Sequence, residues 1–215
     1  MNKRFLLVLV LCVAGLGLIF WFNKDSSNST SGNAQLSSHI FGKGNKKVAL
    51  VEYGDFQCPA CAQYYPVIKQ IKEKYKNDIT FQFVNFPLPS HQKTFAAHRA
   101  AEAASLQGKF WQMHDLLYEN QNSWVESADS YPLFESFAQS LGLDIAKFKQ
   151  DFESPAVNDV INADKQVGLK LKVDSTPTFF LEGKLLDPSP TSLDSFSKLI
   201  KQAIADKSQK LEARD

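Results

Sequence analysis

The hydrophobic and polar positions of the chain predict a strand, a helix and a second strand in its first half. Residues 48–51 form a continuous apolar run, which is typical of a buried strand. After Pro59, apolar residues recur at spacings of three and four as far as Tyr75, as on one face of an amphipathic helix. Residues 79–86 alternate and are rich in aromatic side chains, so they predict the second strand.

A long helical region follows before the chain returns to strands. Residues 174–186 predict a strand, a tight turn at Gly183 and a return strand, and residues 193–205 predict a closing amphipathic helix. This order indicates an α/β fold whose sheet is interrupted by a helical insertion at about residues 91–171. Asp144 is a predicted helix N-cap within the insertion. The predicted helices of the insertion are residues 94–106, 110–118, 132–141, 145–152 and 157–171.

The segment at residues 5–22 is an uncharged run of 18 residues, about 27 Å long as a helix, which is close to the thickness of a bilayer core. Lys3 and Arg4 precede it, so the positive-inside rule places the N-terminus in the cytoplasm and the following chain outside. A cleaved signal peptide is the alternative, because the segment also approaches the length of such a peptide. However, residues 19–22 lack the small side chains of a cleavage site, so an uncleaved anchor is favoured.

The chain is therefore expected to consist of three parts. Residues 1–24 are predicted to hold a cytoplasmic N-terminus and a transmembrane anchor, and residues 39–215 a folded α/β domain. Residues 25–38 are rich in Ser, Asn and Gly and have little to bury, so they predict a flexible linker. The net charge is only +1, and no basic patch is evident after the first 24 residues, which argues against a nucleic-acid partner.

Two of the three cysteines form a Cys-x-x-Cys pair at the start of the first predicted helix. Cys61 lies on the apolar stripe of that helix, and its sulfur is expected to be buried. Cys58 directly precedes Pro59, at the mouth of the helix, where unpaired N–H groups and the positive dipole end favour a thiolate. Because a lowered thiol pKa makes a cysteine nucleophilic near neutral pH, we expect an exposed attacking sulfur at Cys58 and a resolving sulfur at Cys61.

Other uses of a Cys-x-x-Cys pair have less support. A zinc site needs four ligands, but Cys12 lies in the apolar N-terminal segment and the four histidines show no pairing, so they are expected to be surface or capping residues. A structural disulfide with so short a loop would constrain the unfolded chain little. No histidine follows Cys61, which excludes the motif for covalent haem attachment. Redox chemistry without an organic cofactor is favoured, with zinc binding and a structural disulfide as the alternatives.

With these motifs in place, the sequence from about Lys47 to about Ala205 resembles the DsbA-like thiol:disulfide oxidoreductases of the thioredoxin superfamily. The fold implied is therefore a thioredoxin-like α/β fold with a helical insertion, preceded here by the predicted transmembrane helix. The resemblance rests on the helical insertion and on the following residues: Glu52 and Tyr53 before Cys58-Pro59-Ala60-Cys61, the stretch 107–111 with His114 and Asp115, and Thr176-Pro177 before an aromatic strand.

The resemblance also implies roles for particular residues. Pro177 is expected to be cis and to face the cysteines, so that Thr176 and Pro177, with Pro59 and Ala60, contact a substrate chain. Glu52 is implied to lie beneath the buried cysteine and to move protons, and burial would raise its pKa towards neutrality. The alternative for Glu52 is a partly exposed carboxylate at a strand end.

The function implied is that of a single-pass cell-membrane enzyme whose extracytoplasmic domain forms disulfides in exported proteins that carry cysteine thiols. Such an enzyme would be reoxidised by a membrane-bound partner. The strongly oxidising members of the family carry His at the position of Ala60, so we expect a milder oxidant here. A disulfide reductase, a disulfide isomerase and a non-enzymatic module that binds metal or a partner protein are the alternatives.

Overall fold

The computed structural model describes residues 36–213 of the chain. The anchor predicted at residues 1–24, and most of the linker predicted at residues 25–38, lie outside the described residues. Within residues 36–213, no helix combines the length and the apolar character that a membrane crossing requires.

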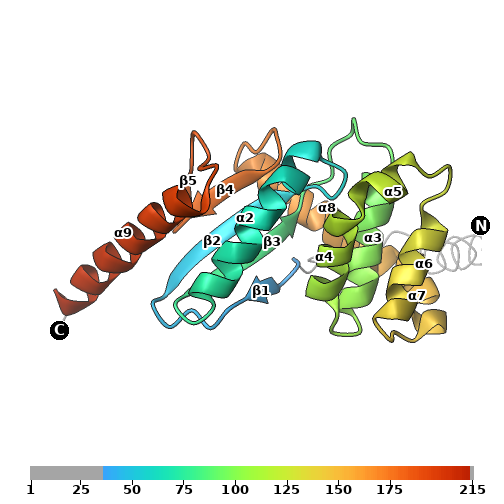
Figure 1. Cartoon of the computed structure of the whole chain (residues 1–215), viewed down its shortest axis with the longest axis horizontal. Coiled ribbons are helices and arrows are strands. Elements are labelled where there is room, and N and C mark those ends of the chain that lie inside the picture. The colour runs from blue at the N-terminus through green and yellow to red at the C-terminus, as the bar shows by residue number, and fades with distance from the viewer. Residues whose placement is uncertain (1–35, 214–215) are drawn as a thin grey trace, which may run out of the picture. The chain divides into compact units, whose positions relative to one another are not determined.

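The centre of the described chain is a five-stranded sheet with the order β1-β3-β2-β4-β5 (Figure 1). β2 (Val48–Gly54) pairs in parallel with β3 (Ile79–Asn85) and antiparallel with β4 (Thr178–Leu181). β5 (Lys184–Leu185) returns from β4 at one edge of the sheet. At the other edge, β1 (His39–Phe41) pairs antiparallel with β3. The sequence did not predict β1, because three residues carry too little periodicity and the strand depends on β3 for its hydrogen bonds.

Two helices cover one face of this sheet. α2 (Pro59–Tyr75) lies across it, and α9 (Leu193–Glu212) packs against both α2 and β2 (Figure 1). Phe179 of β4 packs against both helices: the centroid of its ring lies 5.3 Å from that of Tyr64 in α2 and 5.2 Å from that of Phe196 in α9. α9 extends seven residues beyond the predicted end at Ala205, because its last turns are polar and leave no apolar pattern to read.

The helical insertion between β3 and β4 is as predicted, with one additional helix. Figure 1 shows its helices α3–α7 gathered beside the sheet. The extra helix is α5 (Gln121–Glu126), whose six residues are too few to show a helical period. The N-cap prediction is confirmed, because Asp144 accepts a hydrogen bond from the backbone of Lys147 at 2.9 Å. The other helices are α3 (Thr94–Ser105), α4 (Phe110–Glu119), α6 (Tyr131–Ser140), α7 (Ile145–Phe152) and α8 (Pro155–Lys170).

Three of the four histidines are buried, against the prediction that they are surface or capping residues. His39, His98 and His114 are all buried, and only His91 is partly exposed. His114 contacts the rings of several aromatic neighbours and pairs with Asp115 at 2.9 Å. Burial lowers the pKa of both His98 and His114 to about 4, so they are neutral at pH 7 and pack as aromatic core residues. The surface prediction was wrong for these residues because it considered the polarity of histidine and not the ability of its neutral ring to pack against aromatic side chains.

Candidate redox site

The two cysteines lie where β2 passes into α2. β2 ends at Gly54, where any side chain would collide with the ring of Phe83. A turn follows, in which the backbone N–H of Gln57 donates to the Asp55 carboxylate at 2.8 Å. Asp55 is therefore a turn residue whose side chain binds the backbone two residues further on. The turn ends at Cys58, which is the N-cap of α2 and whose side chain makes no capping hydrogen bond.

The Cys58 thiol is held between its own helix and the loop before β4. In the protonated form, its Sγ donates to the carbonyl oxygen of Thr176 at 3.2 Å, although 118 residues separate the two. The Thr176–Pro177 peptide bond is cis, as the resemblance implied. This loop leaves Cys58 only 6% exposed, so the expectation of an exposed sulfur was wrong. Pro59 is exposed and Ala60 and Pro177 are half-buried, which leaves an accessible surface around the thiol.

The pKa values of the two thiols are displaced in opposite directions. A hydrogen bond from the Cys61 thiol is the largest of the effects that lower the pKa of Cys58 to about 5, and backbone N–H groups of Cys61 and Ala60 add to it. Burial opposes this shift but does not outweigh it. Cys61 is 1% exposed, and burial raises its pKa well above the usual range, with further increases from Cys58 and Glu52. At pH 7 the site therefore holds one thiolate and one thiol.

Glu52 lies below this pair in β2 and is buried, with 3% of its surface exposed. This excludes the alternative of a partly exposed carboxylate. Burial raises the pKa of Glu52 to about 8, Lys72 lowers it and Cys58 raises it further. A carboxyl group with such a pKa is neutral at pH 7 and can both give and receive a proton near that pH.

Sequence reasoning missed a buried cation near the site. Lys72 is 6% exposed, and its ammonium lies 3.9 Å from the centroid of Trp111 and 3.8 Å from a carboxylate oxygen of Asp115. Burial lowers its pKa, while Asp115 and Glu52 oppose that shift. The helical periodicity indicated the burial of Lys72, because this residue follows Ile68 by four positions and therefore lies on the same buried stripe of α2.

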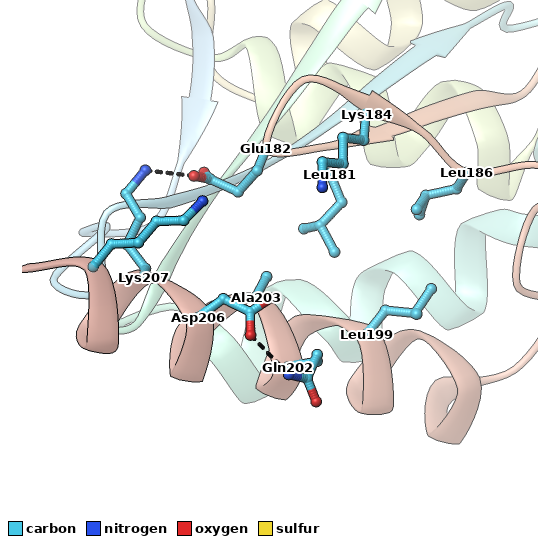
Figure 2. A pocket seen from close by; sticks show the side chains of 10 residues that line it. Leu181, Glu182, Lys184, Leu186, Leu199, Gln202, Ala203, Asp206 and Lys207 are labelled. Carbon is cyan, nitrogen blue, oxygen red and sulfur yellow. Dashed lines mark hydrogen bonds and ion pairs between the residues drawn. The ribbon is translucent and has the colours of Figure 1, made fainter.

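A separate groove of about 460 Å³ lies away from the thiols, between the β4–β5 hairpin and α9 (Figure 2). Leu181 lines it, at the end of β4 that pairs with Leu50, whereas Cys58 follows the opposite end of β2. Its lysine side chains include Lys207, which forms an ion pair with Glu182 across the groove (Figure 2). The groove is therefore not part of the thiol site. In the described part of the chain, no three His, Cys, Asp or Glu side chains are grouped so that they could hold a metal ion.

The fold and the paired thiols define a thioredoxin-like dithiol/disulfide protein. A family model described as thioredoxin matches residues 35–202. The probable disulfide bond formation protein D of Bacillus cereus is 32% identical over 184 residues, which cover 82% of this chain and 82% of that protein. The chain therefore belongs to the thioredoxin family.

Other relatives share only part of their length with this chain. The Na(+)/H(+) antiporter NhaA 1 of Mycolicibacterium gilvum is 35% identical over 149 residues, which cover 68% of this chain and 23% of the antiporter. The chain thus spans about a quarter of the length of such antiporter relatives.

Solved structures show the same fold. The oxidised BdbD of Bacillus subtilis has a TM-score of 0.68 at 21% identity, over 80% of this chain and 100% of that one. The alpha-DsbA1 of Wolbachia pipientis has a TM-score of 0.70 at 22% identity, over 82% and 96%.

Proposed function

We propose that this protein is a membrane-anchored, extracytoplasmic oxidase that forms disulfides in exported proteins through Cys58 and Cys61. The observation that carries the proposal is the opposite displacement of the two thiol pKa values, with Cys58 at about 5 and Cys61 well above its usual range. A dithiol whose reduced form is stabilised in this way is an oxidant, because its disulfide readily accepts two electrons.

In the proposed reaction, a substrate thiolate attacks Cys58 of the oxidised protein and forms a mixed disulfide. The bond between the two cysteines breaks, and Cys61 leaves as a thiolate that takes a proton from Glu52. A second substrate thiolate then attacks the substrate sulfur of the mixed disulfide, which completes the substrate disulfide and releases Cys58. This release is fast because a thiolate of low pKa is a good leaving group. The protein has then gained two electrons, which a membrane-bound partner removes.

The substrate chain is proposed to bind along the loop before β4. The Thr176 carbonyl lies 3.2 Å from the Cys58 sulfur and has no donor there when Cys58 is a thiolate or a disulfide, and the Thr176 hydroxyl has no partner among the described residues. These groups, beside the half-buried Pro177, suit the backbone of an extended substrate. On the other side of the thiol, Pro59 and Ala60 offer an accessible apolar contact.

The direction of the reaction is tested by titrating the dithiol in glutathione buffers. We expect a reduction potential above the roughly −270 mV of thioredoxin and below the roughly −120 mV of DsbA. Ala60→His adds a donor beside the Cys58 thiolate and is expected to raise the potential by about 30 mV, the equivalent of one interaction of about 1.4 kcal/mol. A wild-type potential at or below that of thioredoxin would contradict the oxidase and support the alternative of a reductase.

The proposed topology rests on the apolar run at residues 5–22 and the preceding Lys3 and Arg4. In spheroplasts that express the full chain with an N-terminal tag, added protease is expected to digest the folded domain and to leave the tag intact. A cytoplasmic enzyme serves as the control for lysis. A domain that resists digestion until the cells are opened would refute the proposed location.

A further inference from the structure

The helix that presents Cys58 has an unusual N-terminus. An N-cap side chain normally accepts hydrogen bonds from the free N–H groups of the first turn, but the N-cap of α2 is Cys58 itself and makes no such bond. Pro59 has no N–H, so the N–H groups of Ala60 and Cys61 remain free to stabilise the Cys58 thiolate. The turn before the helix must therefore be held in place by other residues.

Gln121 of α5 reaches this turn from the helical insertion. Its Nε2 donates to the carbonyl oxygens of Phe56 at 2.7 Å and of Cys58 at 3.0 Å. Because both partners are acceptors, only the NH₂ end of the amide can face them. Gln121 is 8% exposed, so water does not readily replace it at these two carbonyls.

Asp55 holds the other end of the same turn. Its buried carboxylate accepts hydrogen bonds from the backbone N–H of Leu88 and from His91 Nδ1, both at 2.8 Å, and from the Thr94 hydroxyl. These donors belong to the loop that leads into the insertion and to the first residue of α3. Both ends of the turn are therefore anchored in elements other than α2 and β2.

We propose that Gln121 is a positioning residue for the redox reaction, which fixes the Cys58 backbone so that the first turn of α2 is aimed at its sulfur. The proposal deepens the proposed function and rests on Cys58 and Cys61 as the reacting pair. The side-chain amide of Gln121 bonds to backbone carbonyls and not to either sulfur, so it acts through the two carbonyls that it holds. Without it, the turn gains freedom, the N–H groups of Ala60 and Cys61 are less well aligned, and the reduced protein is less stabilised.

The test replaces Gln121 by an apolar residue of similar length. In Gln121→Met, we expect the pKa of Cys58 to rise and the dithiol/disulfide equilibrium to shift three- to tenfold towards the disulfide, which is about 15–30 mV. The pKa follows from the thiolate absorbance as a function of pH, and the potential from glutathione buffers.

Gln107→Met is the matched control. Gln107 is another glutamine of the insertion, half-buried where Gln121 is buried, and its amide makes two hydrogen bonds to the backbone of Asp144, at 2.9 and 3.1 Å. The same substitution there is expected to reduce stability and to leave the pKa of Cys58 and the potential unchanged. Equal values for Gln121→Met and wild type, or equal shifts in both variants, would overturn the proposal.

A second variant covers the case in which Gln121→Met does not fold. Gln121→Asn keeps the amide but shortens its reach, so a smaller shift in the same direction is expected, and its absence in folded protein would overturn the proposal. Measurements on the wild type separate a failure of the proposed function from a failure of the positioning role alone. If its dithiol does not cycle reversibly, the proposed function fails; if it cycles and the Gln121 variants behave like wild type, only the positioning role fails.

Discussion

Replacing Cys61 by serine is expected to stop turnover and to leave the protein covalently joined to its substrates through Cys58. At pH 7 a thiol with a pKa of about 5 is about 99% ionised, whereas one with a pKa above 9 is at most about 1% ionised. In this variant no Cys58–Cys61 disulfide can form, so the Cys58 thiolate reacts instead with a substrate disulfide, breaking it and releasing one substrate thiolate. Without the Cys61 thiol, nothing within the protein can attack the mixed disulfide that results. Serine is the suitable replacement, because its hydroxyl can still donate to Cys58 as the Cys61 thiol does.

Three variants make this result specific. Cys61→Ser is expected to accumulate mixed disulfides, which are seen as bands of higher mass that disappear on reduction. Cys58→Ser is expected to form them at least about a hundredfold more slowly, because the remaining thiol is buried and protonated. Cys61→Ala removes the donor as well and should raise the pKa of Cys58 above that of Cys61→Ser. Equal trapping by Cys58→Ser and Cys61→Ser would show that the two sulfurs are not distinguished as proposed.

The second large effect is expected in the pH dependence of stability when Glu52 is replaced by glutamine. The pKa of Glu52 is raised from an ordinary value of 4.5 to about 8 by burial. Between these values the folded protein binds more protons than the unfolded chain, so the wild type loses stability as the pH rises through this window. Each pH unit corresponds to about 1.4 kcal/mol, so Glu52→Gln should be more stable than wild type by on the order of 4 kcal/mol at pH 8.

The measurement is denaturant unfolding of the oxidised protein at a series of pH values. Oxidation is important, because the reduced Cys58 has a lowered pKa and therefore contributes stability that increases between pH 5 and pH 9, with the opposite sign. Near pH 4.5 the two proteins should be almost equally stable. Lys72→Met is a useful second variant, since Lys72 lowers the pKa of Glu52. Its removal should extend to higher pH the range over which the protein loses stability. A difference that does not change with pH would mean that folding does not raise the pKa of Glu52.

Local pattern predicted much of this site because the residues involved are near one another in sequence. The apolar run before Glu52 indicated a buried strand, and the stripe that begins at Cys61 indicated that the sulfur of Cys61 is buried, as the structure shows. The same stripe contains Lys72, but a lysine at a helical position is usually solvated, and only the rings of Phe41, Phe81 and Trp111 around its ammonium reveal the buried cation.

Other features could not be predicted from the pattern, because they are made by residues far apart in the chain. Thr176 is 118 residues from the cysteine that it covers, and this contact makes Cys58 buried where its place at a helix end suggested exposure. Gln121 is 63 residues from Cys58 and lies in a helix of six residues that has no periodic signal. Neither side chain differs in the sequence from many other polar residues.

Local sequence patterns were thus enough to predict the order of strands and helices, the helical insertion, and the dithiol at the start of the first long helix. These follow from periodicity and from the chemistry of neighbouring residues, which act over one or two helical turns. Tertiary contacts, by contrast, set the burial of Cys58, the neutral buried histidines, the cation beneath the site and the hydrogen bonds of Gln121. Burial and hydrogen bonding depend on which distant segments the topology brings together, and the spacing of residues along the chain does not encode this.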